Sequence, residues 1–240
     1  YENFKSRNKY LISNNLIINK KNNERHRNKT CEKNMNTTQR NLSNLNRYTS
    51  TNGDSNQIIL MIGNQTCSRS SHEYLPLKVL ESHLSFGMSS KLFKLFREKN
   101  GLTYEIGVFN PIRKENSPFL IYLSVSNKNA VLAFKILIKL WKSLLTSLIS
   151  EKEIKLAKIK LKSSFLISNQ TLEEILQKRI QLIGYELDPD SEMDSLKKIE
   201  GIKSEDILKI TNKYLSKPFL SIYGNKKISN AIYKLWIKNF

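Results

Sequence analysis

The sequence predicts an α+β protein in which helices pack on one face of a mostly antiparallel sheet. Two observations carry this prediction. First, short apolar runs typical of strands occur at residues 57–63, 102–109, 119–125 and 218–224, and about nine residues join the middle two, as in an antiparallel pair. Second, the chain between the third and fourth runs has the 3.6-residue periodicity of helices. Strands followed by a block of helices are typical of this fold class.

The folded part is expected to begin with a strand and a helix. Residues 57–63 form an apolar run that predicts a buried strand. After a polar loop, leucines and a valine recur with helical spacing over residues 73–85. Gly87 is expected to end this helix, and Ser89 or Ser90 can cap the helix that follows.

Residues 88–109 are the stretch around which the rest of the chain is organised. Two leucines and two phenylalanines at residues 92–96 give a predicted helix one apolar side. Gly101 stands where a helix end favours positive φ, so it is expected to be the C′ cap. Alternation of apolar side chains then predicts a strand. Arg97 therefore falls in the last turn of the helix, and Tyr104 falls early in the strand.

Two long helices are predicted after the pair of strands. An apolar stripe predicts an amphipathic helix at residues 128–149, whose lysines mark the face in contact with water. A second helix is expected at residues 151–168. Its inward-facing residues are expected to be Ile154, Leu156, Ile159, Leu161, Phe165 and Leu166.

The remaining elements are shorter. Thr171 and Glu174 have the spacing of a capping box, which predicts the start of a third helix that runs to about Tyr185. Further helices are predicted on both sides of the last strand, at residues 193–200, 204–215 and 226–238.

Composition divides the chain into two parts. Residues 1–55 are polar, rich in asparagine and positively charged, and they offer little apolar surface to offset the entropy of ordering. We therefore expect a basic linker or loosely ordered arm at residues 1–55 and a folded domain at residues 56–240.

The chain is strongly basic: 40 lysines and arginines against 21 acidic residues give a net charge of +19. Such charge can attract nucleic acid, anionic membranes or acidic peptides. The basic residues are spread along the chain, however, so we attribute them mainly to a soluble surface. Cys31 and Cys67 are too few for a disulfide framework. The longest apolar run, residues 130–149, is interrupted by lysines, so no membrane span is predicted and a soluble compartment, either the cytoplasm or an organelle matrix or stroma, is expected.

The central stretch resembles the second-half domain of the pitrilysin- or insulinase-like zinc metallopeptidases, the inverzincin class. In that family a Ser-Arg-Leu-Phe helix leads into Leu-Arg-Glu-Lys-x-Gly-Leu-x-Tyr. This chain has Ser-Lys-Leu-Phe at residues 90–93 and Phe-Arg-Glu-Lys-Asn-Gly-Leu-Thr-Tyr at residues 96–104. The likeness extends more weakly over about residues 57–240.

The resemblance implies one half of a clamshell in which the other half carries the zinc. It implies that Arg97 and Tyr104 bind the substrate carbonyl and help to stabilise the oxyanion, with Ser89, Ser90, Lys91 and Gly101 as the supporting motif. An arginine fork and a phenolic hydroxyl are suitable donors for charge that develops in a transition state. From periodicity alone, Arg97 could equally be a cation at a helix end, and Tyr104 a core aromatic.

The sequence departs from the family in ways that bear on activity. Lys91 stands where the family has arginine and lacks its bidentate fork, and Gly87 is the only glycine of the run that precedes the motif. The family's zinc motif, His-x-x-Glu-His, is absent: the chain has only His26, His72 and His83. No metal site is therefore expected in this chain, and zinc and the general base are expected in a partner.

We expect a non-catalytic half or subunit of a zinc metallopeptidase that forms a heterodimer with a zinc-bearing subunit, or joins an N-terminal half, and binds peptide substrates. Alone it should be inactive. One alternative is a purely structural peptidase-like subunit. The other is a basic nucleic-acid-binding domain, which we favour less because aromatic residues for base stacking are sparse in the arm.

Overall fold

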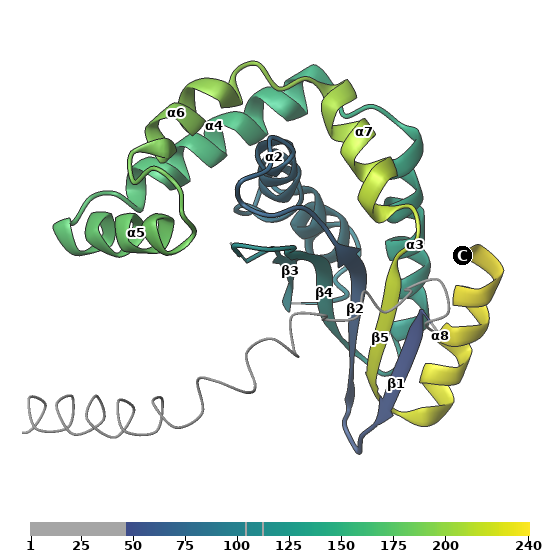
Figure 1. Ribbon diagram of the computed structural model, residues 1–240. Helices are drawn as coiled ribbons and strands as arrows, with labels where there is room; N and C mark the ends of the chain where they lie inside the picture. Colours follow the sequence, from purple (N-terminus) through teal and green to yellow (C-terminus); the bar gives the residue numbers. More distant parts are fainter. Residues whose placement is uncertain (1–46, 104, 112) are drawn as a thin grey trace, which may run out of the picture. The chain divides into compact units, whose positions relative to one another are not determined.

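The computed structural model describes residues 47–103, 105–111 and 113–240. Its sheet has five strands in the order β1-β5-β2-β4-β3 (Figure 1). The strands are β1 (Tyr48–Asn52), β2 (Gln57–Gln65), β3 (Glu105–Phe109), β4 (Pro118–Ser126) and β5 (Phe219–Gly224).

The central strand β2 determines the register of the sheet. It runs antiparallel to both neighbours, with Leu60 opposite Leu123 of β4 and Ile222 of β5. At the far edge β3 runs antiparallel to β4. The sequence prediction of a mostly antiparallel sheet that contains the four apolar runs is therefore confirmed.

The first strand corrects the expected arm at residues 1–55. Residues 48–52 pair in parallel with β5, and Gly53 N–H donates to the carbonyl of Gly224 at 3.1 Å. The sequence Tyr-Thr-Ser-Thr-Asn has no apolar run because β1 is an edge strand that mostly faces solvent. Its anchor is Tyr48, whose ring centroid lies 4.2 Å from that of Tyr233. The rest of the arm, to residue 46, is outside the described residues.

Helices cover one face of the sheet (Figure 1). In chain order they are α2 (Tyr74–Ser85), the motif helix η2 (Phe93–Glu98), α3 (Ala130–Thr146), α4 (Glu151–Ile167), α5 (Leu172–Gly184), α6 (Ser191–Ile199), α7 (Ser204–Leu215) and α8 (Lys226–Asn239). Helices α2, α3, α7 and α8 contact strands, whereas α4 and α6 pack on α2. No helix of the described residues is both long enough and apolar enough to cross a membrane.

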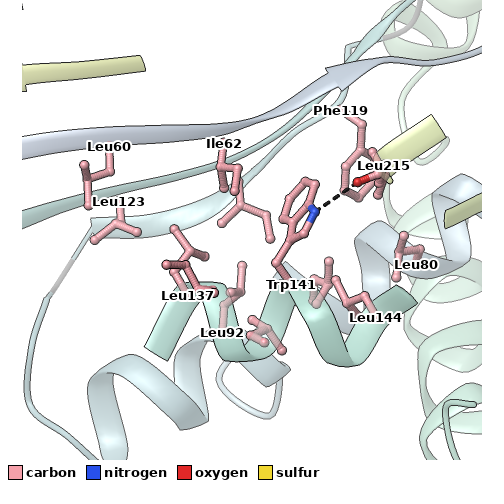
Figure 2. Packing of buried hydrophobic residues seen from close by; sticks show 14 of the residues in the cluster. Leu60, Ile62, Leu80, Leu92, Phe119, Leu123, Leu137, Trp141, Leu144 and Leu215 are labelled. Carbon is pink, nitrogen blue, oxygen red and sulfur yellow. Dashed lines mark hydrogen bonds between the residues drawn. The ribbon is translucent and has the colours of Figure 1, made fainter. Parts of the chain in front are cut away.

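Alternation along β2 gives the sheet one buried and one exposed face. Ile58, Leu60 and Ile62 are fully buried, whereas Ile59 and Met61 between them are exposed. The buried face packs around Trp141 of α3, whose indole N–H donates to the carbonyl of Leu215 at 3.0 Å (Figure 2). The buried indole therefore has its polar atom satisfied.

Helix α4 corrects part of the expected inward face. Ile154, Ala157 and Leu161 are buried, and Ser82 of α2 donates its hydroxyl to the carbonyl of Ala157 at 2.8 Å. The expectation was wrong for Leu156, Ile159 and Leu166, which are exposed. Helix α4 carries apolar residues on two faces, and α2 covers only one of them.

Candidate functional site

The motif helix is anchored by two buried residues on its inner side. Leu92 and Phe96 are almost fully buried, and Leu92 lies among the core residues in Figure 2. Gly87 has φ +73°, which turns the chain out of α2, and its carbonyl accepts the N–H of the buried Ser90 at 3.0 Å. Ser89 is exposed. The sequence stretch therefore has a fixed position on the domain.

Between Phe93 and Glu98 the motif helix is a π-helix, where a continuous α-helix was expected. Lys99 N–H donates to the carbonyl of Lys94, five residues back, at 3.0 Å. Gly101 ends the helix with φ +56°, as a C′ cap requires, and its N–H donates to the carbonyl of Arg97 at 3.1 Å. Such π turns are frequent at functional sites.

Arg97 lies in the last turn of this helix with its side chain exposed. Its guanidinium carbon is 5.0 Å from the centre of the Phe93 ring, within cation–π distance. Phe93 therefore supports the planar guanidinium from one side.

Tyr104, the other half of the expected pair, lies outside the described residues. Its neighbours are tied to β4: the Thr103 hydroxyl donates to the carbonyl of Ser124, and Glu105 N–H donates to the Thr103 hydroxyl at 3.0 Å. The structure therefore describes Arg97, and it describes the backbone before and after residue 104.

Lys91, the fourth residue of the supporting motif, pairs with Glu153 of α4 at 3.1 Å. Burial raises the pKa of Glu153, but hydrogen bonds from Ser150 and Lys91 outweigh this effect and bring the pKa down to about 2. The ion pair joins the residues just before the motif helix to α4, and no sequence pattern indicated this contact.

A small cavity of about 170 Å³ lies beside this ion pair and was also not foreseen. We call it the lysine cavity. It is lined by the ends of α2 and the motif segment and by one face of α4: His83, Ser89, Lys91, Lys94, Leu95, Lys99, Glu153, Leu156, Ala157 and Lys160. Burial lowers the pKa of His83 to about 4, so this imidazole is neutral near pH 7. The cavity was difficult to predict from the sequence, because Lys160 belongs to a helix that lies far along the chain from the motif.

The described residues do not provide a set of ligands for the zinc ion that the family's catalytic half carries. In residues 47–240, apart from 104 and 112, no three His, Cys, Asp or Glu side chains could hold a metal ion together. His72 is exposed, and the adjacent Glu73 accepts hydrogen bonds from Lys213 and Tyr214. His26 is outside the described residues.

Known proteins match this sequence and this fold. A family model described as the peptidase M16 inactive domain matches residues 20–161, more than half of the chain. An uncharacterized zinc protease of Rickettsia felis is 32% identical over 133 residues, which are 54% of this chain and 31% of the relative. Another, from Rickettsia bellii, is 27% identical over 170 residues, 69% of this chain and 40% of the relative. The chain therefore spans less than half of these curated relatives.

Among solved structures, a peptidase M16 inactive domain from Pseudomonas fluorescens has a TM-score of 0.68 at 20% identity. The match covers 75% of this chain and 43% of that one and shows a common fold. The sheet, its helical face and the motif helix define a pitrilysin-like peptidase domain. This chain belongs to the peptidase M16 inactive-domain family, and the resemblance seen in the sequence is confirmed.

Proposed function

We propose that this chain is the non-catalytic half of a zinc metallopeptidase, in which Arg97 and Tyr104 bind the peptide carbonyl and stabilise the oxyanion. Zinc and the general base come from a partner half, either a separate subunit or an N-terminal half of the same protein. The observation that carries the proposal is the match to an inactive domain over residues 20–161, which include the whole arginine–tyrosine motif. The two zinc proteases named above support it, since each is longer than the part matched here.

The position of Arg97 suits this role. Its helix is anchored by the buried Phe96, while its own side chain reaches the surface and rests on Phe93. A donor held in this way needs little reorganisation when negative charge develops on a substrate oxygen. Loss of one such donor typically costs about 3–4 kcal/mol of transition-state stabilisation.

Helix α5 supports the proposed partner. Leu172, Leu176, Ile180 and Ile183 are spaced by four, four and three residues, so they share one side of α5, which we call the α5 apolar face. They are 49–73% exposed. Helix α5 is held by polar contacts to its neighbours, including Lys178 with Asn169 and Arg179 with Asp190. A contiguous apolar face of this kind marks a surface that meets another protein.

Substitutions of the pair test the proposed role. In complex with the zinc-bearing half, Arg97→Ala and Tyr104→Phe should each lower kcat by about 10²–10³-fold. The unfolding midpoint of each variant should stay close to that of the unchanged protein. The double variant should lose less than the sum of the two effects, because both donors serve one oxygen.

Arg113→Ala is the matched control, since it removes an exposed arginine from the loop between β3 and β4. It should leave turnover unchanged. Full activity per folded complex in both Arg97→Ala and Tyr104→Phe would contradict the proposed roles and favour a purely structural subunit. Tight, salt-dependent binding of DNA or RNA by the chain would instead favour the nucleic-acid reading of its charge.

A further inference from the structure

The lysine cavity concentrates positive charge. Four lysines line it, Lys91, Lys94, Lys99 and Lys160, against the single carboxylate of Glu153. His83 adds no charge because its pKa is about 4. Four positive charges and one negative charge give a net charge of +3 around a cavity of about 170 Å³.

Most of this charge has no carboxylate partner among the described residues. Lys91 pairs with Glu153, but among the described residues no carboxylate forms an ion pair with Lys94, Lys99 or Lys160. Two other lysines of the same helix have partners: Lys162 pairs with Glu200, and Lys158 donates to the carbonyl of Glu200 at 2.7 Å. Three lysines without an ion pair, from α4 and the motif segment, thus line one cavity.

The positive charges of these lysines also repel one another. Burial and the nearby charge of Lys94 lower the pKa of Lys160, which shows that the ammonium is less stable here than in water. The attraction of an anion bound among these lysines would offset both this repulsion and the cost of burial.

The cavity suits a small oxyanion. At about 170 Å³ it is smaller than the roughly 300–1,000 Å³ of pockets for drug-sized ligands. Lysine ammonium groups bind phosphate as point charges. The neutral His83 can offer one N–H donor at the wall, and Ser89 can offer a hydroxyl. Lys94, Lys99 and Lys160 supply the charge.

We propose that the lysine cavity is a binding site for a phosphate group, carried either by inorganic phosphate or by a small phosphate monoester. The bound anion would connect the motif helix to α4 at Lys94, Lys99 and Lys160, next to the existing Lys91–Glu153 pair. The site goes beyond the proposed peptidase role and does not depend on it, since Arg97 does not line the cavity.

Thermal unfolding and calorimetric titration of the full chain with inorganic phosphate test this site. Ionic strength is held constant with chloride, and glycerol phosphate serves as the monoester. Inorganic phosphate should raise the unfolding midpoint in a saturable way. A rise with glycerol phosphate but none with inorganic phosphate would identify a monoester as the ligand. The double variant Lys94→Gln with Lys160→Gln should weaken binding by about a hundredfold, because each charged hydrogen bond contributes about tenfold or more.

The matched control removes the same charge from α3, through Lys135→Gln with Lys139→Gln, which are both exposed and do not line the cavity. It should bind phosphate like the unchanged chain. Without phosphate, the cavity variant should be as stable as the unchanged chain or more stable, because a repulsion is lost. No saturable stabilisation by either anion, equal losses in both double variants, or lower stability of the cavity variant without phosphate would each overturn the proposal.

Discussion

The helix α3 and the helix α5 are both amphipathic, yet they treat their apolar residues in opposite ways. On α3, Phe134, Leu137 and Trp141 are fully buried against the sheet. On α5, only Leu182 is buried, and the α5 apolar face is open. Apolar periodicity alone therefore does not distinguish residues that fold this domain from residues that we propose meet the partner half.

The largest expected effect comes from the buried side of this comparison. Trp141→Ala removes the largest fully buried side chain of the described residues and leaves the carbonyl of Leu215 without its indole donor. It should lower the free energy of unfolding by about 3–5 kcal/mol, measured by urea denaturation of the isolated chain. Leu176→Ala on α5 is the contrasting control and should change it by less than about 0.5 kcal/mol. Comparable losses in the two variants would remove the distinction.

A second effect belongs to His83, which is buried where α2 meets α4. The unfolded chain protonates this group near pH 6.5, but the folded chain does so only near pH 4, mainly because of burial. Glu153 favours the protonated form, whereas Lys91 and Lys160 oppose it. The stability from the neutral imidazole is therefore complete above about pH 6.5 and is lost as the pH falls towards 4.

The size of this loss should reach up to about 3 kcal/mol. Unfolding midpoints of the unchanged chain and of His83→Gln, measured between pH 7 and pH 4, test it. The unchanged chain should lose more stability over this window than the variant. Parallel curves would show that His83 does not titrate differently in the two states.

The smallest effect on folding is expected on α5. The pair Leu176→Gln and Ile180→Gln should leave the unfolding midpoint of the isolated chain nearly unchanged, because neither side chain is buried. Binding of the zinc-bearing half, measured by calorimetry, should weaken at least about tenfold, since loss of buried apolar contacts at an interface costs 1 kcal/mol or more. Gln177→Ala and Gln181→Ala, on other positions of the same helix, are the controls. Unchanged affinity in the apolar variant would place the partner elsewhere.

Local patterns were sufficient for most of the fold. The capping box at Thr171 and Glu174 forms as predicted, and the positive φ of Gly101 ends the motif helix. The positions of β2, β4 and β5 followed from short apolar runs, and that of β3 from apolar alternation.

The failures have a common physical reason, which is that they depend on distant residues. Strand β1 is recognised only through its pairing with β5, about 170 positions later. The outward direction of Leu156 on α4 depends on where α2 lies. In the candidate site, Arg97 could be named from the motif, whereas the lysine cavity requires Lys160 to meet Lys94 across two helices.

The most direct test of the central claim measures peptide hydrolysis by this chain, by the zinc-bearing half and by their mixture, with zinc content determined for each after dialysis. We predict no stoichiometric zinc and no hydrolysis for this chain alone, little hydrolysis for the zinc-bearing half alone, and a large increase on mixing. The increase should be lost when the mixture contains Arg97→Ala. About one tightly held zinc per molecule of this chain, or equal hydrolysis by the zinc-bearing half with and without it, would contradict the account.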